Sequence, residues 1–146
     1  MLSNKTKYAI KALLAIYHNE QKENFLPLQV SSIAEQQNIP QKFLELIVLD
    51  LKKIGAIESK RGKGGGYFLI KPAKDITIGD VIRFFEGQIA LLPCVSQNRY
   101  RPCEDCKSED ECNLRILMQK VRDKTAKILD ETSLYCFANN HHSNLV

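Results

Sequence analysis

Apolar residues recur every three to four positions in three stretches near the start of the chain, the spacing that puts them on one side of a helix. The stretches cover residues 4–19, 29–37 and 40–54. The third is the most regular, with apolar positions at Phe43, Leu44, Ile47, Leu51 and Ile54. The pattern predicts three helices, with Pro40 opening the third and Gly55 ending it in a left-handed conformation.

The segment that follows, AIESKRGKGGGYFLIK, predicts two short strands around a glycine-rich turn. A phosphate-binding P-loop is excluded, because that motif needs a helix after the glycines and a Ser or Thr after its lysine. Two helices joined by a tight turn and followed by a hairpin are the order of a winged helix-turn-helix. The predicted fold class is therefore mainly α with a small β-hairpin wing.

The second half predicts a helix that ends at Glu86, a loop, and one long helix. We expect a winged helix-turn-helix domain over 1–86, a cysteine-rich loop over 87–111, a C-terminal dimerisation helix over 112–137 and a tail over 138–146. Within the last two of these segments we expect one long helix from about Cys112 to Glu131, and from Ser133 on a short turn and a frayed end. The apolar stripe of the long helix exceeds what one small domain buries, which favours a homodimer over packing across its own domain.

Length and composition place the chain among ordinary globular proteins of one domain. It shows no signal peptide and no membrane-spanning segment, so we expect a cytoplasmic location, where thiols stay reduced. Residues 1–74 hold 12 Lys and Arg against 6 Asp and Glu, whereas residues 75–146 hold 9 against 11. A basic front half suggests a polyanionic partner, although a solvated surface would give the same count.

Candidate DNA contacts gather in the hairpin and at the start of the third helix. The first turn of that helix would enter a major groove, and the hairpin would meet phosphates, unless it is only a flexible turn with solvated charges. Asp50 has the wrong charge for such contacts and is expected to be solvated. The residues concerned are Gln41, Lys42 and Glu45 in the helix, and Lys60, Arg61 and Lys63 in the hairpin.

Four of the five cysteines lie within nineteen residues, among several acidic side chains. Thiolates so close together repel one another unless a cation lies between them, and an iron–sulfur cluster or zinc ion would supply it. Only one pair has the short spacing typical of structural zinc. The residues alone favour a cluster, with zinc and a thiol switch as alternatives. The four are Cys94, Cys103, Cys106 and Cys112.

The chain resembles the IscR/NsrR (Rrf-type) family of winged-helix regulators from about Leu2 to Phe137. The resemblance is carried by KYAIKALLAI, by IGAIESKRGKGGGYFLIKPAKDITIGDVI, which is its most specific block, and by the cysteine loop ahead of a long helix. It implies a homodimeric transcription factor that binds double-stranded DNA, with a [2Fe–2S] or [4Fe–4S] cluster in many members. It also adds Pro40 and Gly64 to the expected DNA contacts.

The family's three cluster cysteines correspond to Cys94, Cys106 and Cys112, and Cys103 is an extra one. Arg115 stands where cluster-biogenesis members carry a histidine ligand, and it cannot ligate because it stays protonated. Lys7 stands where nitric-oxide-sensing members carry a carboxylate. The fourth ligand is therefore open between Cys103 and a residue of the partner chain.

These observations lead to one functional hypothesis. The chain is a homodimeric transcriptional regulator whose affinity for a pseudo-palindromic operator depends on a cluster in the cysteine loop. A winged-helix regulator with a structural zinc, or with a thiol–disulfide switch, is the alternative. We expect no enzyme activity and no small-molecule substrate, because no catalytic set of side chains is evident.

Overall fold

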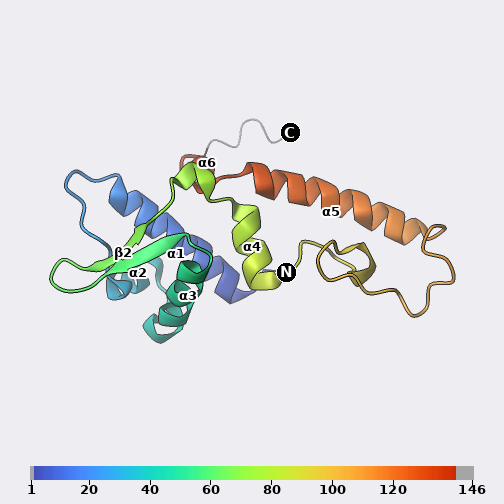
Figure 1. Cartoon of the computed structure of the whole chain (residues 1–146), viewed down its shortest axis with the longest axis horizontal. Coiled ribbons are helices and arrows are strands. Elements are labelled where there is room, and N and C mark those ends of the chain that lie inside the picture. Colours follow the sequence, from blue (N-terminus) through green and yellow to red (C-terminus); the bar gives the residue numbers. More distant parts are fainter. Residues whose placement is uncertain (1, 141–146) are drawn as a thin grey trace.

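The computed structural model describes residues 2–140, so most of the predicted tail, 141–146, lies outside the described residues. A helical head carries a β-hairpin wing, and a long arm extends from the head along the longest axis (Figure 1). The arm consists of one long helix with the cysteine-rich loop beside it, and the wing lies at the opposite end of the molecule. This arrangement confirms the predicted fold class.

Three helices build the core of the head, as predicted. They are α1 (Asn4–Glu20), α2 (Val30–Gln37) and α3 (Gln41–Lys53). Ser3 caps α1 by accepting a hydrogen bond from the backbone of Thr6, and Gly55 takes the expected left-handed conformation after α3 at φ +67°. One predicted core residue differs, because Phe43 is 37% exposed and packs edge-on against Tyr8. The fully buried side chains include Leu13, Ile16, Ile33, Leu44, Ile47, Leu51 and Ile57.

The wing consists of β1 (Ile57–Lys60) and β2 (Gly66–Leu69), paired antiparallel. The segment before α2 joins it, because the backbone groups of Leu28 and Tyr67 exchange hydrogen bonds of 2.9 and 2.8 Å. A Cβ at Gly66 would lie 2.6 Å from the carbonyl carbon of Leu28, so the close approach needs glycine there. The wing is thus fixed to the head along one edge.

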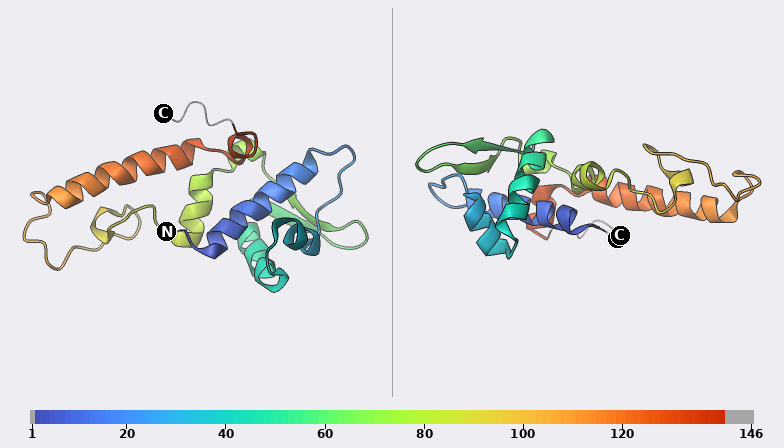
Figure 2. Two further views of the ribbon diagram at one scale, coloured as in Figure 1. Left: turned by 180° about the vertical axis from the view of Figure 1, so that it is seen from behind. Right: turned by 90° about the horizontal axis from the view of Figure 1, so that it is seen from below.

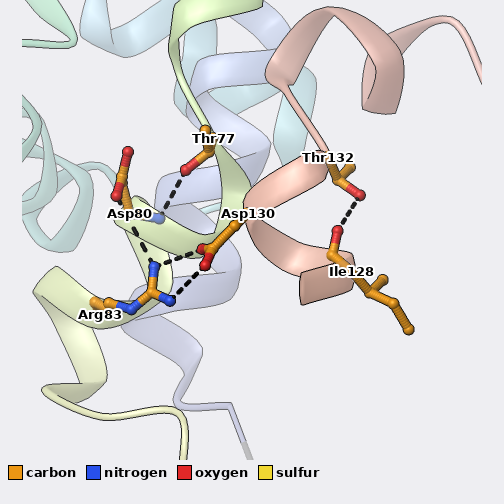
Figure 3. Close-up of polar contacts among 6 residues, drawn as sticks. All are labelled: Thr77, Asp80, Arg83, Ile128, Asp130 and Thr132. Carbon is orange, nitrogen blue, oxygen red and sulfur yellow. Dashed lines mark hydrogen bonds and ion pairs between the residues drawn. The ribbon is translucent and has the colours of Figure 1, made fainter. Parts of the chain in front are cut away.

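A polar joint connects the head to the arm between α4 (Ile78–Glu86) and α5 (Asn113–Glu131). The guanidinium of Arg83 donates two hydrogen bonds of 2.5 and 2.7 Å to the carboxylate of Asp130, and it lies 3.9 Å from Asp80 (Figure 3). Thr77 caps α4 by accepting from the backbone of Asp80, as predicted. The hydroxyl of Thr132 donates to the carbonyl of Ile128 and closes the last turn of α5.

The end of the chain differs from the prediction. The long helix α5 ends at Glu131, as expected, but after a break at Thr132 the structure has a further short helix, α6 (Leu134–Ala138). The expected frayed end from Ser133 on is therefore wrong over the described residues. Leu134 is fully buried in the core of the head, and its backbone N–H donates to Ile76. Burial of this large apolar side chain is favourable and holds the segment after α5 against the head.

Candidate functional site

The first turn of α3 points away from the core and is open to solvent. Gln41, Lys42 and Glu45 are exposed, and Pro40, which precedes the helix, is exposed too. The amide of Gln41 donates to the carboxylate of Glu45 at 3.2 Å, so these two side chains lie side by side. The structure therefore brings the four predicted residues to one exposed helix start.

Asp50 is a structural residue, and the expectation that it would be solvated is wrong. Its side chain is only 14% exposed and lies 2.6 Å from Lys5 of α1 and 2.7 Å from Lys53. The hydrogen bond from Lys5, followed by the one from Lys53, lowers the pKa of Asp50 below its usual value. Lys5 also lies over the ring of Phe85. Asp50 therefore holds α3 against α1 rather than facing a ligand.

The tip of the wing presents positive charge without internal neutralisation. Lys60, Arg61 and Lys63 are exposed, and none has an ion-pair partner among residues 2–140. Gly64 beside them has φ +73°, a conformation that favours glycine. By contrast, Lys52 is engaged by Glu58 and Ser59, which ties α3 to β1. The exposed cations suit a polyanion.

The cysteine loop is anchored along α5 at the turn that contains its first cysteine. Cys94 lies in a short 3-10 turn, η2 (Pro93–Val95), and is buried. The guanidinium of Arg122 on α5 donates to the carbonyl of Val95 at 2.5 Å, which fixes the turn against the helix. No local sequence pattern marks Arg122, because its partner is a backbone group distant in sequence.

Cys106 and Cys112 form a neighbouring pair at the tip of the arm. Cys112 caps α5, and its sulfur accepts from the backbone N–H of Arg115 at 3.5 Å, which lowers the pKa of Cys112. Partial burial, followed by the neighbouring Cys112, raises the pKa of Cys106. Of the two thiols, that of Cys112 therefore loses its proton more readily and is the one more easily present as a thiolate.

Cys103 is exposed and lies beside Asp105. The backbone hydrogen bond from Asp105 lowers the pKa of Cys103. The partial loss of solvent around the thiol and the negative charge of Asp105 together outweigh this effect, so the pKa of Cys103 is raised. Within residues 2–140, no three His, Cys, Asp or Glu side chains converge as ligands for one metal ion. Cys106 and Cys112 are thus the part of the predicted ligand set that the structure brings together.

Arg115, which cannot be a ligand, still contributes to this pair. Besides its backbone hydrogen bond, its positive charge lowers the pKa of Cys112, and its Nε lies 3.4 Å from Glu109. Lys7 on α1 is exposed. Residues 115 and 7 therefore do not supply the imidazole or the carboxylate that the family resemblance associates with these two positions.

A second connection joins the head to the start of the cysteine loop. The carboxylate of Glu86, the last residue of α4, accepts hydrogen bonds from the backbone and the hydroxyl of Ser3, each at 2.8 Å, and from the hydroxyl of Thr6. The hydrogen bond from the buried Thr6 is the main cause of the lowered pKa of Glu86. No local sequence pattern signals this contact, because its partners are about 80 residues apart.

The arm carries a large uncovered apolar surface. No side chain of α5 is buried, and Leu114, Leu117 and Ile128 are each more than 40% exposed. Beside them a groove of about 500 Å³ runs between α5 and the end of α4, lined by Leu2, Ile82, Ile89, Leu91, Val121 and Leu129 among others. The turned views show α5 standing clear of the head along most of its length (Figure 2). No helix within residues 2–140 has the length and apolar character needed to cross a membrane.

Comparison with known proteins gives consistent matches over almost the whole chain. Residues 2–140 match the Rrf2 family, described as iron-dependent transcriptional regulators. An Rrf2-like HTH-type transcriptional regulator of Rhodobacter capsulatus is 38% identical over 134 residues, covering 92% of this chain and 89% of that protein. The HTH-type transcriptional regulator IscR of Photorhabdus laumondii is 32% identical over 139 residues, covering 95% and 79%.

Among solved structures, CymR, the global cysteine regulator of B. subtilis, has a TM-score of 0.76 at 29% identity, covering 96% of this chain and 97% of that one. The relatives are transcriptional regulators and not enzymes, which confirms the expectation from the sequence. Together with the winged-helix fold, these matches show that the chain belongs to the Rrf2 family and is a DNA-binding transcriptional regulator related to IscR and CymR.

Proposed function

We propose that the chain works in the cytoplasm as a homodimer whose affinity for a pseudo-palindromic DNA operator is set by an iron–sulfur cluster in the cysteine loop. The observation that carries this proposal is that the arm, made of the cysteine loop and α5, is tied to the DNA-binding head where the loop begins and where α5 ends. Glu86 holds its beginning to α1, and the Arg83–Asp130 pair holds the far end of α5 to α4. A change in the loop can therefore alter how the head is held.

DNA docking is supported by the charge and exposure of two elements. The start of α3 offers Gln41, Lys42 and Glu45 to base edges, with Pro40 shaping the approach. The wing offers Lys60, Arg61, Lys63 and the open backbone at Gly64 to phosphates. Two such heads would enter successive major grooves about 34–36 Å apart.

A homodimer is supported by the uncovered side of α5 and the groove next to it. An amphipathic helix with no buried residue is unusual in an isolated domain. A second copy of α5, placed across the groove, would cover both surfaces with the same residues from each protomer. Dimerisation would also fix the distance between the two heads.

The donor set fits a cluster in its chemistry. Cys94, Cys106 and Cys112 would be ligands, with Cys103 or a residue of the partner subunit as the fourth. The hydrogen bond and charge from Arg115 favour the thiolate of Cys112, which is the form that binds metal. When bound, an iron–sulfur cluster supplies redox and ligand-exchange chemistry that responds to oxidants, nitric oxide or iron supply. The residues of this chain position the thiolates and connect them to the head.

The test is a comparison of operator affinity with and without the cluster. Protein isolated without oxygen should bind iron and sulfide, and its affinity for a selected operator should differ about 5- to 150-fold from that of the cluster-free form. Cys112→Ser should remove this difference, whereas Cys136→Ser, in α6 outside the loop, should keep it. Equal affinity of the two forms of the wild-type protein would contradict the proposal.

A thiol switch is the second candidate, and one observation favours it. Cys106 and Cys112 lie next to each other with unequal thiol acidity, which is the arrangement that eases disulfide formation. In this case peroxide would change the affinity of the metal-free protein, and reduction would restore it. A structural zinc would instead give colourless protein whose affinity is insensitive to both treatments.

A further inference from the structure

The outer side of α3 carries apolar residues where polar ones are usual on a DNA-facing helix. Leu46 is 58% exposed and Leu49 is 51% exposed. With Lys42 and Lys53 they form one stripe at positions 42, 46, 49 and 53, which lies opposite the buried positions Leu44, Val48 and Leu51. Single exposed leucines are common on proteins, but here two adjoin each other between two lysines.

The charges around the stripe indicate what covers it. Lys42 has no ion-pair partner within the described residues, and the same holds for the three cations of the wing tip. The only carboxylate at the start of α3, that of Glu45, already accepts a hydrogen bond from Gln41. Lys53, at one end of the strip, is paired with Asp50, whereas Lys42 at the other end is not neutralised. An apolar strip beside a free cation fits duplex DNA better than an apolar protein surface, because DNA presents phosphates on both sides of the groove.

A leucine side chain cannot form hydrogen bonds, so it cannot discriminate between the donors and acceptors of base edges. The one apolar feature of the major groove is the C5-methyl group of thymine. We propose that Leu46, extended by Leu49, is a specificity-determining residue that contacts thymine methyl groups in each half-site of the operator. This inference rests on the proposed docking of α3 in the major groove.

Leu46 is the principal contact because it lies in the second turn of α3, next to Lys42, whereas Leu49 lies one turn further from the helix start. In a helix-turn-helix the N-terminal part of the second helix approaches the bases most closely. The inference therefore predicts a thymine next to the base pairs contacted by Lys42 and Glu45, at the same place in both half-sites.

Replacing thymine by uracil tests this directly, because uracil lacks only the methyl group and keeps every hydrogen-bonding atom. In an operator selected from random DNA, each thymine would be replaced in turn and affinity measured by fluorescence anisotropy. At the contacted thymine we expect about a fourfold loss per half-site, the factor for one buried methyl group, and a larger loss when both half-sites are changed. Leu46→Ala should bind the thymine operator more weakly and show no further loss with uracil.

Lys63→Ala is the matched control, because the wing is expected to contact phosphates. It should weaken binding to both operators equally and keep the uracil penalty. If wild-type protein binds its operator strongly and tolerates uracil at every position, the inference is wrong while the proposed docking can still hold. If Leu46→Ala loses as much affinity on replacement of thymine by uracil as the wild-type protein does, another residue makes the methyl contact, and the inference is also wrong. If no sequence-specific operator can be selected, the proposed docking fails as well.

Discussion

The close contact between Gly79 and Asp130 gives a quantitative test of the head–arm joint. A Cβ at Gly79 would lie 2.1 Å from Oδ1 of Asp130 and 3.1 Å from Nη1 of Arg83, whereas ordinary contact begins at 3.4 Å. Gly79→Ala must therefore displace the carboxylate by more than 1 Å, which breaks its two hydrogen bonds with Arg83. The absence of a side chain at residue 79 is what lets α5 meet α4 here.

The magnitude follows from two opposing effects. The Arg83–Asp130 pair has two good hydrogen bonds but is partly exposed, at 28% and 44%, so its loss should cost about 1 kcal/mol, the top of the range for surface pairs. Alanine in place of a helical glycine stabilises by about 0.5–1 kcal/mol. Gly79→Ala should thus be nearly neutral in the wild-type protein. In an Asp130→Ala background it should stabilise, because no ion pair remains to be lost.

The measurement is a double-mutant cycle by urea or thermal unfolding at fixed protein concentration. The effect of Gly79→Ala should be more favourable by about 1 kcal/mol in the Asp130→Ala background, or roughly 4 °C in melting temperature. Asp123→Ala is the matched control, since Asp123 is an exposed acid on α5 whose one ion pair within residues 2–140 is with the neighbouring Arg122. Equal effects of Gly79→Ala in all three backgrounds would mean that Asp130 does not lie against Gly79 in solution.

Three further predictions concern the wing, the arm and the connection at Glu86. Arg61→Ala should weaken binding to all DNA sequences and lower the salt dependence by about one phosphate per protomer; an unchanged slope would remove the wing from the interface. Leu117→Asp should shift the protein from dimer to monomer in light scattering, whereas Asp123→Lys, about 120° away around α5, should leave the dimer intact. The pKa of Glu86 is lowered from its usual 4.5, so its contribution to stability is complete above about pH 4.5 and is lost as pH falls through the lowered value. Thr6→Val removes the main cause of this shift, and urea midpoints from pH 3 to 6 should then fall less steeply; an unchanged pH dependence would contradict this role.

The sequence by itself determined the elements and the fold class. The helical pattern of residues 40–54, with glycine after it, predicted α3 and its end, because a buried stripe and a left-handed cap are local properties. The basic residues around three successive glycines likewise predicted the wing. The spacing of the cysteines indicated a sulfur-rich site, and the start of α3 indicated the surface offered to DNA.

Only the tertiary structure decided which polar residues hold the parts together. Asp50 looked like a solvated acid, yet it is engaged by Lys5 of α1, far from it in sequence. Glu86 and Asp130 give no local signal either, because their partners are brought to them by the packing of α1 and α4. The burial of Leu134 in the core of the head also depends on how elements distant in sequence pack around it. Periodicity records which side of an element faces inward, but contacts between distant elements follow from how those sides meet.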